Sequence, residues 1–76
     1  MRNLNRISNF YLRQQAEIDW LKLANFAKSK GYAPLVEDCQ YPQNAGFKTI
    51  DKHFDRLRQC LVKGGVAESE IPTKNL

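Results

Sequence analysis

Few residues of this chain are of types that could do chemistry: one histidine, two cysteines and a few acidic pairs. His53 and Cys60 fall on nearly the same side of a predicted helix, and a cysteine nucleophile needs a base of this kind. At the rise of an α-helix, however, they lie about 10 Å apart, which is too far for proton transfer. We therefore interpret His53 as a residue at the edge of the core and predict no catalytic residue.

An acidic pair at helical spacing, Asp51 and Asp55, could suggest a metal or acid–base site. Basic residues surround this pair, so ordinary solvated charge is the favoured interpretation. The other acidic pairs, Glu37 with Asp38 and Glu68 with Glu70, lie in a short connecting segment and in the tail. We predict that the protein is not an enzyme.

The two cysteines, Cys39 and Cys60, have no close spacing and could join only one histidine. A structural zinc site takes four Cys or His ligands, so we predict no metal and no cofactor. Packing as small apolar thiols is favoured over a disulfide between them.

The length and composition are those of one folded domain covering residues 1–76. Apolar residues make up 42% of the 76 residues, and the net charge is +4. No apolar run approaches the roughly 18 residues of a membrane span, and residues 1–6 do not begin a signal peptide. We expect a soluble cytoplasmic protein that does not bind a membrane, and its basic charge makes an acidic partner plausible.

A long helix is predicted from about residue 8 to residue 30. Ser8 or Asn5 would cap its start, and Gly31 would end it. Apolar residues recur along it at helical spacing and form a core stripe: Leu12, Ala16, Trp20, Leu23 and Ala27.

A second helix is predicted over residues 47–63, followed by the stop signal Gly64-Gly65. Between the two helices, Pro34 could begin a short helix over residues 35–39, and a short strand over 33–36 is the alternative. The tail from about residue 66 is polar except for Val66, Ile71 and Leu76, and it contains Pro72, so we expect it to be loosely held. The predicted fold is all-α: two main helices with a short helix or irregular segment between them.

The first helix also carries a second apolar stripe, roughly opposite the first: Ile7, Phe10, Tyr11, Ile18 and Leu21. Either the middle of the chain wraps around this helix, or another chain covers the stripe. We expect a homodimer or a stable complex.

The second helix presents cations opposite its apolar stripe. Within ~80° of arc it carries Lys48, Lys52, Arg56 and Lys63. Such a face can bind phosphates or enter a major groove, with Thr49 and Gln59 able to form hydrogen bonds. A solvated surface without a ligand is the alternative.

Residues 49–57, with the sequence TIDKHFDRL, resemble the recognition helix of helix-turn-helix and winged-helix DNA-binding domains. In this resemblance, residues 33–39 stand for the preceding helix. It implies DNA contacts by Thr49, Lys52, His53 and Arg56.

The function that we expect is nucleic-acid binding by a small regulatory or accessory protein. The basic face of residues 47–63 would bind, and Arg2 and Arg6 would act as an N-terminal arm. The alternative is a protein-binding adaptor or inhibitor, such as a phage or another mobile element might encode against a host protein. It would use the second apolar stripe, with Phe10, Tyr11 and Leu21 as anchors.

Overall fold

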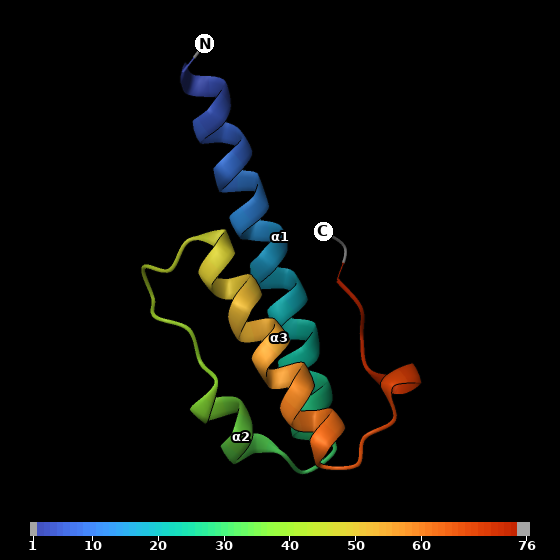
Figure 1. Cartoon of the computed structure of the whole chain (residues 1–76). Coiled ribbons are helices and arrows are strands. Elements are labelled where there is room, and N and C mark those ends of the chain that lie inside the picture. Colours follow the sequence, from blue (N-terminus) through green and yellow to red (C-terminus); the bar gives the residue numbers. More distant parts are fainter. Residues whose placement is uncertain (1, 75–76) are drawn as a thin grey trace.

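The computed structural model describes the backbone of residues 2–74 and the side chains of residues 9–74. It contains the helices α1 (Arg2–Ser29), α2 (Ala33–Asp38) and α3 (Phe47–Lys63), and a short 3₁₀ turn, η1 (Glu68–Glu70). No β-strand occurs between residues 2 and 74, so the all-α prediction is confirmed. The segment between the long helices forms the short helix α2 instead of the alternative strand (Figure 1).

Helix α3 has the predicted bounds, and Gly64-Gly65 marks its end in the sequence. Its apolar residues face the core, and Ile50, Phe54, Leu57 and Leu61 are buried. At its end the N–H of Val66 donates to the carbonyl of Leu61 at 3.0 Å. Gly65 has a φ of 103°, a left-handed conformation that glycine adopts without a steric penalty.

Helix α1 begins at Arg2, earlier than the predicted residue 8. Asn5 and Ser8 lie inside the helix, so the prediction that one of them caps its start is wrong. Residues 2–7 contain no proline or glycine, and a capping residue by itself does not force a helix to begin. The other end is close to the prediction: α1 ends at Ser29, and Gly31 has a φ of 93°.

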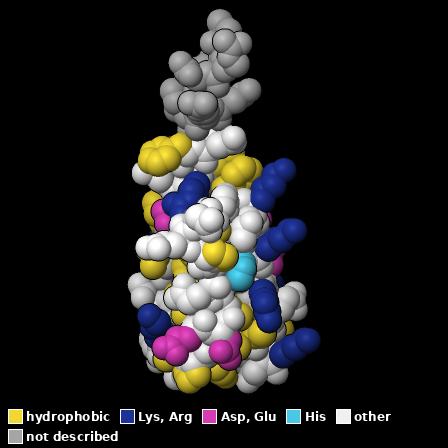
Figure 2. All heavy atoms as spheres, turned by 90° about the vertical axis from the view of Figure 1, so that its left-hand side faces the viewer, with side chains coloured by type: hydrophobic (Ala, Val, Ile, Leu, Met, Phe, Trp, Pro, Cys, Tyr) yellow, Lys and Arg dark blue, Asp and Glu magenta, His cyan; other side chains and the backbone are white. Residues whose placement is uncertain are grey.

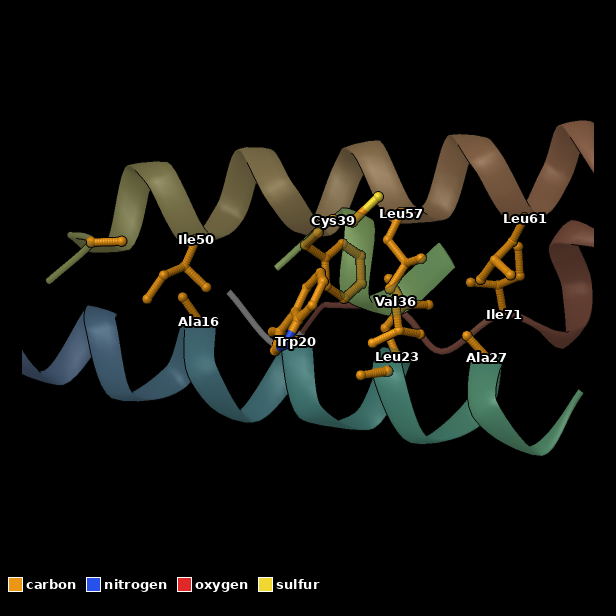
Figure 3. Close-up of a cluster of buried hydrophobic side chains, with 13 residues drawn as sticks. Ala16, Trp20, Leu23, Ala27, Val36, Cys39, Ile50, Leu57, Leu61 and Ile71 are labelled. Carbon is orange, nitrogen blue, oxygen red and sulfur yellow. The ribbon is translucent and has the colours of Figure 1, made fainter. Parts of the chain in front are cut away.

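Helices α1 and α3 run side by side in the same direction (Figure 1). Their core side chains face one another in pairs with a constant offset of 34 positions (Figure 3): Ala16 with Ile50, Leu23 with Leu57, and Ala27 with Leu61. The predicted core stripe of α1 is buried except for Leu12, which is half-buried. Parallel neighbouring helices require the chain to travel back along their length, and residues 30–46 make this return.

The return segment is fixed on α1 by Arg13 and Trp20. The Arg13 guanidinium donates from Nε to the carbonyl of Ala45 at 2.7 Å and from Nη2 to that of Gln43 at 3.0 Å. The ring of Trp20 meets that of Tyr41 edge-on at 5.7 Å. These contacts set where α3 can begin, and so determine its register on α1.

Two residues of the tail after α3, Ile71 and Lys74, make contacts with the rest of the domain that the sequence did not predict. Ile71 is buried and lies between Leu61 and Ala27 in the core (Figure 3). Further on, the Lys74 ammonium reaches the side of α3 and pairs with two carboxylates. The segment through Lys74 thus packs on the domain, in contrast to the loose tail that we expected from residue 66.

Four residues of the second apolar stripe of α1 are not covered by the part of the chain that the structure describes. Phe10, Tyr11, Ile18 and Leu21 are 62%, 58%, 43% and 55% exposed. The alternative in which the middle of the chain wraps around α1 is therefore wrong for these four residues. Ile7, the fifth member, lies outside the residues whose side chains the structure describes.

No helix between residues 2 and 74, α1 included, combines the length and the apolar character that crossing a membrane requires.

Candidate nucleic-acid interface

The basic face predicted on α3 is an open surface in the structure. Because Ile50, Phe54, Leu57 and Leu61 hold one side of the helix in the core, the opposite side faces solvent. It carries four exposed cations, which we call the basic column: Lys48, Lys52, Arg56 and Lys63. Figure 2 shows Lys and Arg side chains in a row beside His53, the one histidine of the chain. Among the described residues, none of these four cations forms an ion pair.

The neutral residues predicted for this surface differ in their availability. Thr49 and Gln59 are exposed beside the basic column. His53 is half-buried, and its Nδ1 lies 2.7 Å from the carbonyl oxygen of Cys39. A carbonyl can only accept a hydrogen bond, so Nδ1 carries the proton and only Nε2 is left for a ligand. His53 therefore joins the end of α2 to the middle of α3.

The two acidic residues beside the column are occupied by a cation from the tail. The Lys74 Nζ lies 2.6 Å from Asp51 Oδ1 and 2.8 Å from Asp55 Oδ1. It also lies 5.2 Å from the centre of the Phe54 ring. Burial lowers the pKa of the Lys74 ammonium, but its hydrogen bonds to both carboxylates outweigh burial, so the net pKa is raised. One of the two negative charges that we expected to be solvated is thus balanced by Lys74.

Other charges of the chain are paired away from the column. Arg58 on α3 binds Glu68 at 3.1 Å, and Lys30 lies 3.5 Å from Glu70. The side chains of Arg2 and Arg6, the predicted N-terminal arm, lie outside the described residues. Sequence reasoning missed Lys74 and Arg13, because each acts on a partner far along the chain that no local pattern indicates.

The two cysteines are free thiols in the structure, Cys39 buried and Cys60 half-buried. Burial, together with the neighbouring Cys60 thiol, raises the pKa of the Cys39 thiol, which keeps it protonated and weakly nucleophilic. In the described part of the chain, no three His, Cys, Asp or Glu side chains gather to hold a metal ion. The described residues also form no pocket.

Comparison of the chain with protein-family models, with curated proteins and with solved structures gives no match. The resemblance of residues 49–57 to a recognition helix therefore stays a prediction. In the structure, eight residues, 39–46, separate α2 from α3.

Proposed function

We propose that this protein binds nucleic acid through the basic column of α3, as a small regulatory or accessory protein. The observation that carries the proposal is the column itself: four exposed cations on the side of α3 opposite its buried stripe, none of which pairs with a described carboxylate. Lys48, Lys52 and Arg56 follow one another at about 6 Å along the helix axis. Cations in such a row can each neutralise a backbone phosphate.

Two further features support an anionic ligand at this surface. Lys74 balances one of the two negative charges of Asp51 and Asp55, and so weakens their repulsion of phosphates. In addition, α3 has no acidic residue in its first turn and no side-chain hydrogen bond at its N-cap residue, Gly46. The positive end of the helix dipole therefore adds to the field of Lys48.

Salt dependence of binding tests the proposal. A labelled DNA duplex and a labelled single strand would be titrated with the protein at several salt concentrations, with fluorescence anisotropy as the readout. If all four cations contact phosphates, the slope of log K against log salt for duplex DNA is about −3.6. Lys52→Ala with Arg56→Ala halves this slope to about −1.8, and removing these exposed charges changes the stability by no more than about 0.5 kcal/mol.

The matched control is Lys22→Ala with Lys28→Ala, which removes the same charge from exposed positions on α1. This control keeps most of the slope if the basic column is the binding surface. Absence of binding to either nucleic acid at low salt contradicts the proposal, and so does an equal loss of slope in both double variants.

The exposed stripe of α1 supports a second candidate function, that of a protein-binding adaptor or inhibitor. Tyr11 and Leu21 are more than half exposed, and they are large enough to serve as anchors in a partner's pocket. Binding to a host protein would then be lost in Tyr11→Ala with Leu21→Ala and kept in Lys52→Ala with Arg56→Ala. The opposite pattern contradicts this candidate.

A further inference from the structure

The exposed apolar side chains of the second stripe lie on one side of α1. Phe10, Tyr11, Ile18 and Leu21 lie within ~100° of arc on the side of α1 turned away from α3. Single exposed apolar residues are common on protein surfaces, but several large ones gathered on one side of a helix indicate an interaction surface. We call this group, with Gln14 at its middle, the outer face of α1.

We propose that the outer face of α1 binds the outer face of a second copy of this chain, with the two α1 helices antiparallel. A symmetric interface needs a surface that is complementary to itself, so that each contact occurs twice. In a register centred on residue 15, Phe10 meets the partner's Leu21 and Tyr11 meets the partner's Ile18. Each contact places an aromatic ring against an aliphatic side chain, and the two contacts lie on opposite edges of the outer face.

The middle of the outer face fits the same register. Gln14 comes close to the partner's Gln14 near the two-fold axis. A side-chain amide both donates and accepts, so the two glutamines can bond to each other. A single polar pair inside an apolar helix interface fixes its register. At the border, Arg13 is already paired within its own chain with Glu17 at 3.2 Å and does not require a partner.

The length of α1 gives an independent argument for this occupant. With the constant offset between α1 and α3, the first residue of α3, Phe47, corresponds to Arg13, so the turns of α1 before Arg13 extend beyond α3 (Figure 1). An isolated helix of fewer than ~12–15 residues is marginal in water without packing. The register centred on residue 15 overlaps α1 with the partner's α1 over almost its full length. The turns of α1 before Arg13 then lie along the part of the partner's α1 that packs on α3. The dipoles of the two antiparallel helices point in opposite directions, which is favourable.

The exposed area indicates a weak dimer. At the exposures given above, Phe10 and Tyr11 each offer about 120 Å², and the four apolar side chains together on the order of 400 Å². Two copies would bury about 800 Å² of apolar surface, and the polar neighbours raise the total toward the ~1,200 Å² of the smallest stable interfaces. The association should therefore depend on concentration.

Sedimentation of the full chain, without nucleic acid, tests the proposal independently of the proposed function. From about 1 µM to about 1 mM, the mass of the wild-type protein should rise from one chain toward two. Leu21→Glu should stay at one chain over this range. Asn9→Glu adds the same charge at an exposed position of α1 off the outer face, and it should behave as the wild type. Circular dichroism confirms that each variant is folded.

A wild-type protein that stays at one chain near 1 mM overturns the proposal and leaves the outer face to a different partner. A dimer that Leu21→Glu does not weaken also overturns it, because the contact then lies elsewhere.

The antiparallel arrangement has its own readout, which needs no substitution. In a mixture of isotope-labelled and unlabelled protein, filtered nuclear Overhauser contacts between chains should join the Phe10 ring to Leu21 methyl groups. Within one chain these residues are about 16 Å apart along α1, so such a contact can arise only between copies. Contacts from Phe10 to Tyr11 between chains instead would show a parallel pair and refute the register.

Discussion

Lys74 holds the end of the described chain on α3, and its replacement by alanine tests how the tail is attached. The ammonium group lies within hydrogen-bond distance of Asp51 and Asp55 and over the ring of Phe54. Only 25% of the Lys74 side chain is exposed, although the two carboxylates are 37% and 59% exposed. Lys74→Ala removes all three interactions and leaves two carboxylates one helical turn apart without their shared cation.

The size of the effect follows from the exposure of each partner. Partly exposed ion pairs contribute about 0.2–1 kcal/mol each to the free energy of unfolding. The contact between the ammonium and the ring adds about 0.5–1 kcal/mol. We expect Lys74→Ala to lower the free energy of unfolding by about 1.5 kcal/mol, which lowers the Tm of a domain of this size by about 6–12 °C.

Urea denaturation of four proteins would separate the ion pairs from the ring contact. They are the wild type, Lys74→Ala, the double variant Asp51→Asn with Asp55→Asn, and the triple variant that combines them. The losses of stability in Lys74→Ala and in the Asp51→Asn, Asp55→Asn variant should sum to more than the loss in the triple variant. The difference, which is the coupling energy between Lys74 and the two carboxylates, should be about 0.5–2 kcal/mol and should decrease at high salt. Lys52→Ala is the control, because Lys52 is exposed and makes no ion pair with a described residue. A Lys74→Ala protein as stable as this control, or additive losses in the triple variant, would refute our account of the tail.

Two further predictions concern titratable side chains in the core and tail. Cys39→Ser should destabilise the protein by about 1–3 kcal/mol, and more than Cys60→Ser, because its hydroxyl is buried. Nucleic-acid binding should survive both changes, and its loss in a folded variant would contradict a packing role. Burial raises the pKa of Cys39 above its ordinary value of 9.0 and the pKa of Tyr41 above its ordinary value of 10.0, and the Lys74 pKa is also raised. As the pH rises, these three groups therefore lose their protons at a lower pH in the unfolded chain than in the folded protein. Stability should therefore fall as the pH rises above about 9, and thermal unfolding at an unchanged Tm from pH 8 to 11 would contradict this sign.

Local sequence patterns were sufficient to predict α3, because this helix has a clear stop signal and a single buried face. The four residues of α3 that are buried recur at helical spacing, and Gly64-Gly65 ends the helix, so its bounds and its basic column followed from the sequence. The start of α1 did not follow, because residues 2–7 contain neither a helix breaker nor a cap that the fold uses. Good helix formers such as Arg2 and Leu4 alternate with the poorer Asn3 and Asn5 in this segment, so no residue marks the first turn.

Contacts between distant segments could not be predicted. Arg13 binds carbonyls of the return segment only because residues 30–46 run back along α1. Ile71 lies in a mostly polar tail, and nothing in its immediate neighbours indicates that it packs beside Leu61. Likewise, the bond from His53 to the Cys39 carbonyl depends on how α2 is placed. Each of these contacts depends on tertiary geometry, which a periodicity argument does not contain.

The parallel arrangement of α1 and α3 has a consequence for how fast the chain folds. In a helical hairpin, neighbouring helices touch first near their short loop and then zip together. Here three core pairs between α1 and α3, Ala16 with Ile50, Leu23 with Leu57 and Ala27 with Leu61, each join residues 34 positions apart. None of them can form until residues 30–46 have closed as a loop. Small helical proteins fold in microseconds to milliseconds because their contacts are local. This domain, although built from helices, should fold toward the slow end of that range.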